Sequence, residues 1–485
     1  MCFRYIYCVI WIITLIIMYK KLSRSYGLGA IIAIAYIGLF SPLDYMTLSY
    51  TSVSLICVLL MATMAYSDEI LTRKKSVQKG IIIGVLTTVC TLCYPYFAGF
   101  YVIYNFIAII CIAKNMLTGS DLQKEKAKSL LYFSLTMLGV CALCAASYLI
   151  WILANASPEQ ILVNIQMIFT DPQHQSKGII AGIADLVKRE LQVGKIFYGG
   201  IGLLSVIALL LGKKRKQFRI VILGVAFLLW GYCQLPILAK PYEYLNIHMK
   251  GIAVVGILFI VLLEKRPWKL FICFYSFSIM YIIVGYLNSN TAVTVVAMCM
   301  SVAGVAAMLM VVNLAAELRN QYKECNVEKC CAALIISAFA VCQIALELNI
   351  RFRYTYYDDT LSKLTEEISV GSAKGLMTVP EKAEQHEELY NTFMLHMPNE
   401  ENGENTLLIY GTDPWLYLET DMKYDTMSSW LLGDSQIYKR LEKYYDINQK
   451  ELPEYIFVEY VPEIIPDEYE ATELNNTAML TRVLY

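Results

Sequence analysis

Charged residues are scarce in this chain: they make up 17% of its 485 residues, against about a quarter in ordinary soluble domains. Cysteine is absent after Cys342, so the last part of the chain has no disulfides. No P-loop, GxGxxG or HExxH pattern occurs, which argues against an ATP-driven pump. The sequence holds instead a series of apolar runs, which alternate with short polar links up to residue 347.

The net charge of −1 conceals two parts of opposite sign. Residues 1–347 hold 29 Lys and Arg against 15 Asp and Glu, a balance of +14. Residues 348–485 hold 11 against 26, a balance of −15. We therefore expect a membrane domain over 1–347 and a soluble domain over 348–485, in a protein that does not bind nucleic acid.

The apolar runs predict a polytopic α-helical membrane protein with about 12 transmembrane helices. Several runs are shorter than the ~20 residues that cross the hydrocarbon, and Gly27–Phe40 can also be a re-entrant or buried segment. The expected spans are Ile6–Tyr19, Gly27–Phe40, Ser49–Tyr66, Gly80–Tyr94, Tyr96–Ala113, Ser129–Leu153, Ile196–Leu211, Phe218–Leu238, Met249–Leu263, Leu270–Tyr286, Ala292–Val312 and Cys331–Leu346.

Lysine and arginine sort the links into two sets, and this sorting predicts the orientation in the membrane. Alternate links, from Lys20 through Lys329, hold 22 basic residues, whereas the other links, including the long link 154–195, hold six. The basic links are expected to be cytoplasmic, so residues 348–485 are expected outside the cell membrane. Because Met1 would then lie outside as well, we expect one further helix and one external loop upstream of it.

The long link is expected to form two amphipathic helices that flank a polar centre. Apolar residues recur at helical spacing from Ile161 to Phe169 and from Ile179 to Leu191, with His174 and Lys177 between them. Such helices can lie in the membrane interface as a floor for a lipid-linked substrate, or pack on the helix bundle as a plug; the sequence leaves both open.

The external link Ala239–Lys250 collects lysine, histidine, carboxylate and tyrosine side chains beside the membrane. Lysine can neutralise a phosphate, and aromatic rings can pack on a sugar or an isoprenoid chain. The alternative, favoured on spacing alone, is an aromatic belt with snorkelling lysines. The candidate substrate-binding residues are Lys240, Tyr242, Glu243, His248 and Lys250, with His174 and Lys177 from the long link.

Residues 348–485 predict a small α/β layer with a parallel sheet. The segment Gly411–Tyr417 follows a strand at the end where α/β proteins usually bind ligands, although it suits a turn and a helix cap better. The expected strands are Gly375–Val379, Thr406–Tyr410 and Tyr455–Tyr460, and the expected helices are Pro380–His396, a short one after Pro414, and one near Asp434–Tyr445.

Four segments of the chain carry a resemblance to a known family. They are the basic turn Tyr19–Gly27, the external turn and helix start Ser41–Leu55, the glycine-bearing helix Gly80–Pro95 that runs into a proline turn, and the exported segment Gly411–Asp421. The first three are similar to a cytoplasmic turn, the next external turn and a later helix of the polytopic GT-C class glycosyltransferases that depend on polyprenyl-phosphate sugars, such as protein mannosyltransferases and aminoarabinose transferases. The fourth resembles the exported segment of bacterial members.

The resemblance implies sugar transfer from a polyprenyl-phosphate donor at the outer membrane face to a glycan, lipid or protein acceptor, and leaves a divalent cation open as a cofactor. Such enzymes take their catalytic base from the first external loop. We expect that loop upstream of this chain, and a fragment that lacks it would be inactive. Family members often have Asp or Asn where Thr51 stands. Asp44 is the nearest carboxylate and therefore the candidate base.

Two other classes of function stay open. The first is a transporter or flippase of lipid-linked saccharides, which a polar site at the membrane midplane with broken helices would favour. The second is a membrane protein without catalytic activity whose exported acidic domain binds a wall polymer or another partner.

Overall fold

The computed structural model describes most of the chain, which divides into two compact units. Unit 1 comprises 1–152 and 176–357, and unit 2 comprises 153–175 and 358–485, so the structure groups part of the long link with the C-terminal residues. The residues described are 2–42, 47–67, 72–169, 178–239, 247–288, 293–321, 327–355, 359–397, 405–411, 413–426, 437–458, 469–474 and 477–482.

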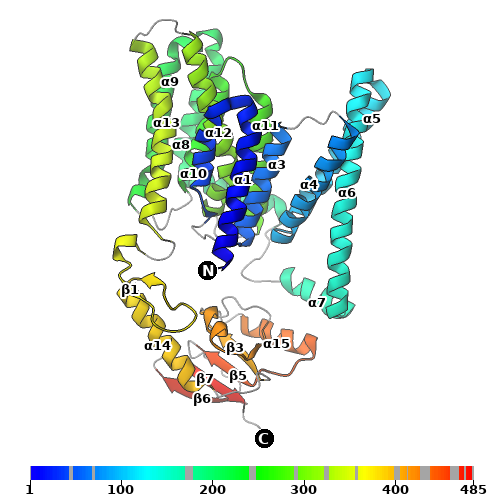
Figure 1. The fold of residues 1–485 in the computed structure, drawn as a ribbon, viewed down its shortest axis with the longest axis vertical. Coiled ribbons are helices and arrows are strands. Elements are labelled where there is room, and N and C mark those ends of the chain that lie inside the picture. The colour runs from blue at the N-terminus through cyan, green and yellow to red at the C-terminus, as the bar shows by residue number, and fades with distance from the viewer. Residues whose placement is uncertain are drawn as a thin grey trace. The chain divides into compact units, whose positions relative to one another are not determined.

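Unit 1 is built from helices (Figure 1). Within the described residues, nine helical stretches are long and apolar enough to cross a membrane, and a bent pair brings the number to ten. The helices are α1 (Cys2–Tyr26), α2 (Ala30–Gly38), α3 (Tyr50–Ser67), α4 (Arg73–Cys93), α5 (Phe97–Thr118), α6 (Asp121–Asn155), α8 (Ile179–Leu210), α9 (Arg215–Ala239), α10 (Ile247–Leu262), α11 (Trp268–Leu287), α12 (Val293–Gln321) and α13 (Val327–Arg353).

These helices give the chain the architecture of a polytopic helical membrane protein, as the apolar runs predicted. Three segments differ in detail from the expected spans. The first two spans form one helical stretch, Arg4–Gly38, and α10 is shorter than the helices counted as long enough to cross a membrane. Helix α8 bends by 89° at Gly194, so that the second predicted interfacial helix and the following span share one helix.

Helix α12 lies at the centre of unit 1 and packs against α2, α10, α11 and α13. Its middle is rich in Ala, Gly, Ser and Met, and small side chains let membrane helices approach closely. At Gly304 an added Cβ would collide with the ring of Tyr36 of α2. Apolar burial alone does not drive helices together in lipid, so this close packing is the main cohesion of the bundle.

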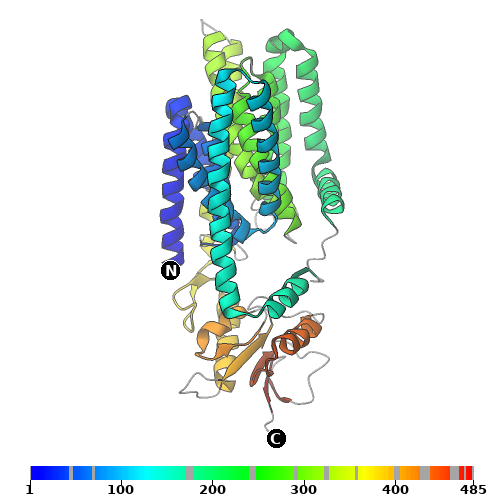
Figure 2. The same ribbon diagram turned by 90° about the vertical axis from the view of Figure 1, so that its right-hand side faces the viewer.

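Helices α4, α5 and α6 carry mostly exposed apolar side chains, as expected of helices that face lipid. Helix α4 runs beside α6 (Figure 2). Small residues recur every four positions on its contact face, at Ser76, Gly80 and Gly84, and all three are buried. A Cβ at Gly80 would lie 2.8 Å from the carbonyl oxygen of Phe133, so the contact requires glycine there.

A buried ion pair ties several helices together at the end of unit 1 that holds basic links. Arg219 of α9 lies 3.3 Å from the carboxylate of Glu317 of α12 and also donates to the carbonyl oxygen of Leu262. The other carboxylate oxygen of Glu317 accepts from the backbone N–H groups of Glu264 and Lys265. Because both oxygens are satisfied, we attribute a structural role to this pair.

Unit 2 contains a five-stranded sheet of order β4-β3-β5-β7-β6. Strand β3 (Thr406–Tyr410) pairs in parallel with β4 (Lys423–Tyr424) and β5 (Tyr455–Val458), as the alternation of strands and helices predicted. The sheet as a whole is mixed, because β6 (Tyr469–Leu474) and β7 (Thr477–Arg482) form a hairpin that lies antiparallel to β5. A short ribbon of β1 (Glu366–Glu367) and β2 (Met377–Thr378) lies elsewhere in the unit.

Apolar residues alternate along the inner strands of this sheet, so each face has its own core. Leu408 and Ile456 pack with Leu441 and Tyr445 of α15 (Ile437–Asn448). Their sequence neighbours on the other face pack with Phe393 of α14 (Pro380–His396) and with the 3-10 helix η6 (Pro414–Glu419), which follows β3. The remaining elements of the unit are α7 (Pro158–Phe169) and η5 (Leu361–Lys363).

Replacing Gly304 by alanine tests the close packing of α2 on α12. The added methyl must displace the Tyr36 ring, and overpacking of this kind typically costs about 1–3 kcal/mol. We expect the apparent melting temperature of the purified protein in detergent to fall by several degrees. Gly139→Ala, at a helical glycine with open space around its Cα, is the matched control and should not lower it. Equal melting temperatures for the two variants would contradict this account.

Candidate functional site

Two of the predicted substrate-binding residues, His248 and Lys250, lie in the described part of the chain. Both belong to the first turn of α10 and both are buried, with 3% and 2% of their surfaces exposed. Helix α10 begins two residues before the expected span, so that His248 belongs to the helix as Lys250 does. The other candidates, Asp44, His174, Lys177, Lys240, Tyr242 and Glu243, lie outside the described residues.

Lys250 forms a buried ion pair with Glu190 of α8. Its Nζ lies 2.5 Å from Oε2 of Glu190, and these side chains are 3% and 13% exposed. The ammonium also stands 5.1 Å from the ring centroid of Tyr198, whose hydroxyl donates to the same carboxylate oxygen. The second oxygen, Oε1, has no hydrogen-bond partner among the described residues.

The bend in α8 creates this arrangement. Glu190 and Tyr198 lie on either side of Gly194, where φ is −123° and ψ is 18°. A Cβ at this glycine would lie 2.6 Å from the ring of Tyr198. Glycine therefore allows the close approach of the ring, and the bend brings two residues of one helix onto Lys250.

A second polar group surrounds the backbone of His248. The carbonyl oxygen of His248 accepts from Nε2 of Gln343 at 3.1 Å and from Nε2 of Gln234 at 3.5 Å. Gln343 also accepts from the indole of Trp230 at 3.1 Å and donates to Glu347 at 3.0 Å. Three helices, α9, α10 and α13, therefore meet through side-chain amides rather than through apolar contacts alone.

Glu347 is the most confined carboxylate of this group. Its side chain is 2% exposed, and its Oε2 has no hydrogen-bond partner among the described residues. Leaving such an oxygen unsatisfied in an apolar interior is costly, and ionisable groups inside membrane proteins usually mark functional sites. Glu347 is therefore a candidate proton acceptor that the sequence analysis missed.

We name these residues the α10 cluster. They gather at the start of α10, whereas the Arg219–Glu317 pair lies at its other end, about 18 Å away along the helix axis. The cluster is thus at the end of unit 1 opposite to the basic links that contain Arg219 and Lys265. Its members are Glu190, Tyr198, Trp230, Gln234, His248, Lys250, Gln343 and Glu347.

The sequence contained a signal for the missed residues, namely polar side chains inside or beside apolar runs. Gln234 and Gln343 interrupt predicted spans, and Glu347 directly follows one. Glu190 falls in a predicted amphipathic helix, where a carboxylate is expected on the solvated face. The bend at Gly194 turns Glu190 toward Lys250. A single glycine in the sequence does not by itself predict such a bend.

Within the described residues, no group of three or more His, Cys, Asp or Glu side chains is arranged to hold a metal ion. The α10 cluster contributes two carboxylates and one histidine, but its carboxylates bond to an ammonium, a phenol and an amide instead.

The other predicted ligand segment, Gly411–Tyr417 in unit 2, is described at Gly411 and from Asp413 onward, where it leads into η6. Pro414 occupies the first helical turn, and Asp413 accepts from the indole of Trp415 at 2.9 Å without capping the helix. Burial raises the pKa of Tyr417 to about 12, and its hydroxyl accepts from the N–H of Ile409. These contacts fasten η6 to β3, which is a structural role.

Comparisons of the chain with protein-family models, with curated proteins and with solved structures find no match. The glycosyltransferase resemblance therefore stays a hypothesis that rests on the segments given for it and on the chemistry of the α10 cluster.

Removing one partner of the Lys250–Glu190 pair tests its burial. Lys250→Met leaves the Glu190 carboxylate without a counter-charge, which typically costs about 3–5 kcal/mol for a buried pair. We expect a clear fall in the melting temperature in detergent and partial recovery in the double variant with Glu190→Gln. Lys128→Met, which breaks an exposed pair with Glu125, is the control and should leave the melting temperature unchanged. Additive effects of the two substitutions would show that the pair does not form.

Proposed function

We propose that the protein is a membrane glycosyltransferase that takes its sugar from a polyprenyl-phosphate donor at the outer membrane face. The observation that carries the proposal is the buried ammonium of Lys250, held by Glu190 at the end of unit 1 opposite to the basic links. Sugar transfer creates negative charge on the departing phosphate, and a preorganised cation in a water-poor site stabilises that charge strongly.

In this proposal Glu190 and Tyr198 position Lys250, and the donor phosphate approaches the ammonium from the outer face. His248 lies two residues earlier in the same turn of α10. The adjoining links, which lie outside the described residues, would supply further groups: Lys240, His174 and Lys177 for the phosphate, and Tyr242 and Glu243 for the sugar.

Transfer also needs a base that removes the proton from the acceptor hydroxyl. The resemblance points to Asp44. The α10 cluster offers Glu347, which has one carboxylate oxygen free of hydrogen bonds among the described residues. The two carboxylates are alternatives for the same role, and substitution distinguishes them.

The proposal places unit 2 outside the cell membrane, with the acceptor bound on that side. The support is the uneven distribution of basic residues, 22 on one set of links against six on the other.

Tag accessibility tests this orientation. A protease-cleavable tag after Tyr485 should be removed from intact cells, whereas a tag in the basic link 213–217 should be cleaved only after the membrane is permeabilised. Protection of the C-terminal tag in intact cells would contradict both the orientation and the transferase proposal.

A donor-release assay tests the activity. The purified protein is incubated with polyprenyl-phosphate mannose or polyprenyl-phosphate arabinose and a membrane extract as the source of acceptor, and release of polyprenyl phosphate is measured. We expect Asp44→Asn or Glu347→Gln, whichever removes the base, to lower the rate by about a hundredfold or more. Glu159→Gln, at an exposed carboxylate, is the control. If no donor is consumed, or if neither variant changes the rate, the assignment fails.

A flippase of lipid-linked saccharides is the second candidate, and the bend of α8 favours it. Broken membrane helices commonly line the binding sites of transporters. Here the 89° bend at Gly194 adjoins a buried ion pair. Reconstitution separates the two functions, because a flippase would move the labelled donor across proteoliposomes without cleaving it.

A further inference from the structure

Unit 1 contains a cavity of about 390 Å³ that lies apart from the α10 cluster. Its wall is formed by five helices, α3, α4, α5, α6 and α11, and it consists largely of aromatic and methionine side chains. The volume falls within the range of about 300–1,000 Å³ that is usual for ligand pockets.

The cavity is long and apolar. Its wall includes α4 from Lys79 to Cys90, a length of about 16 Å at 1.5 Å per residue. Rings from three other helices line it, among them Phe100 of α5, Phe133 of α6 and Phe277 of α11. This shape and chemistry suit a flexible hydrocarbon chain better than a sugar or a nucleotide, which would require several polar partners.

One end of the cavity is basic. Lys79 is the one charged residue among those that line it. Lys269 of α11 stands 5.8 Å from the ring centroid of Tyr66, next to the lining residue Ala65, and Arg73 stands 4.6 Å from the ring of Tyr132, next to Phe133. The start of each of two helices, α4 and α11, therefore brings a cation to this end.

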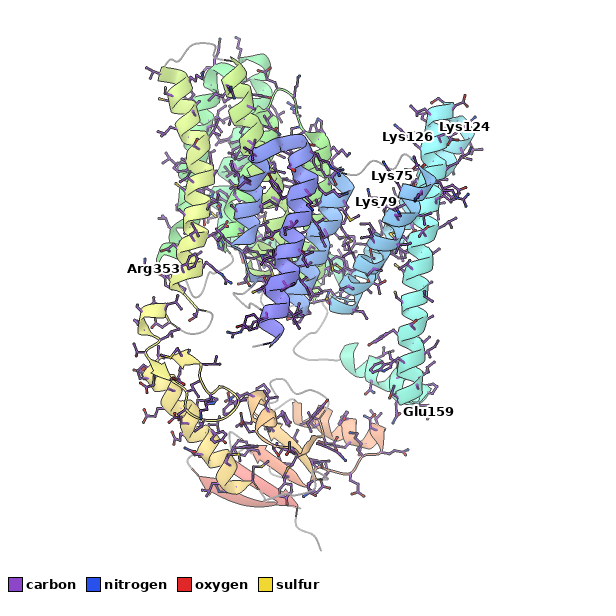
Figure 3. All side chains as sticks on the ribbon, in the orientation of Figure 1. Lys75, Lys79, Lys124, Lys126, Glu159 and Arg353 are labelled. Atoms are coloured by element: carbon purple, nitrogen blue, oxygen red, sulfur yellow. The ribbon has the colours of Figure 1, made fainter. Side chains whose placement is uncertain are left out.

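This basic end belongs to the same side of unit 1 as the Arg219–Glu317 pair. Lys269 lies four residues after Lys265, whose backbone N–H donates to Glu317. Figure 3 shows Lys75 and Lys79 of α4 and Lys124 and Lys126 of α6 toward one common end of these helices. The cavity thus opens its charged end away from the α10 cluster and toward the basic links.

We propose that this cavity binds an anionic phospholipid, with an acyl chain between α4, α5 and α11 and the phosphate beside Lys79, Lys269 and Arg73. The occupant follows from charge and position: a lysine near a membrane surface attracts an anionic headgroup by about 1 kcal/mol. Helices α5 and α6 expose apolar surface to lipid, so a chain can enter from the bilayer.

The proposed lipid is distinct from the sugar donor. A donor whose phosphate reacts at the α10 cluster would need its charge at the opposite end of unit 1. The lipid would instead fill the space between α4–α6 and the central bundle, and so hold these helices in place. The inference does not depend on the glycosyltransferase proposal.

Lipid binding to the purified, delipidated full chain tests the inference. Native mass spectrometry would compare dioleoyl-phosphatidylglycerol, dioleoyl-phosphatidylcholine and polyprenyl phosphate. We expect tight binding of one phosphatidylglycerol and a higher melting temperature in its presence. Lys79→Ala should weaken phosphatidylglycerol binding about five- to tenfold and leave phosphatidylcholine binding unchanged. Lys126→Ala, an exposed lysine toward the same end, is the matched control.

A photoreactive group at the end of the acyl chain locates the tail. Crosslinks should map to residues around Cys90 and Phe97, far from Lys79 along α4, and Ala65→Phe should abolish them by filling the cavity. If Ala65→Phe does not fold, Lys79→Ala still tests the proposal, because it removes the charge and leaves the apolar wall of the cavity unchanged. Any one of three results would overturn the proposal. The first is that the wild type binds the two phospholipids equally, the second is that Lys79→Ala binds phosphatidylglycerol as the wild type does, and the third is that polyprenyl phosphate displaces phosphatidylglycerol.

Discussion

Hydrocarbon offers no partner to a polar group, and this constraint decides where unit 1 places its charges. Two buried ion pairs among its described residues, Arg219–Glu317 and Lys250–Glu190, lie near the two ends of α10, where each joins helices that are distant in sequence. Between them, cohesion comes from small residues such as Gly304, which bring backbones together without polar groups. The bundle is therefore fastened electrostatically at its ends and by close packing in its middle.

The carboxylates at the two ends differ in how completely their oxygens are hydrogen-bonded. Both oxygens of Glu317 accept hydrogen bonds, as expected of a carboxylate with a structural role. Glu190 receives both of its contacts on one oxygen, and Glu347 likewise uses one. A carboxylate oxygen without a hydrogen bond in an apolar setting is unfavourable for stability, which is why the carboxylates of the α10 cluster, and not Glu317, support a functional proposal.

Sequence patterns predicted the elements that depend on residues close in the chain, and missed the features that depend on packing between distant segments. The period of apolar residues predicted the helices, and the strand–helix alternation predicted β3 and α14 with the bounds observed. The hairpin of β6 and β7 was not predicted, because β7 is held by pairing with β5, and β6 by pairing with β7, rather than by an apolar pattern of their own. At the site, Lys250 was predicted for its charge beside the membrane. Its partner Glu190 was not, because a bend of 89° at Gly194 has no counterpart in hydrophobic periodicity.

The two candidate functions make different demands on the Lys250–Glu190 pair. A transferase gains most if Glu190 and Tyr198 keep the ammonium fixed, because a preorganised charge needs no reorganisation as the phosphate departs. A flippase must change conformation around its site, and the bend at Gly194 is the point in α8 where the pair could separate. The ring of Tyr198 packs directly against that glycine, so rotation about the bend would have to displace the ring and its hydrogen bond to Glu190. Contacts that fasten both sides of the bend to a single lysine favour a rigid site, and for this reason transfer is the better supported of the two functions.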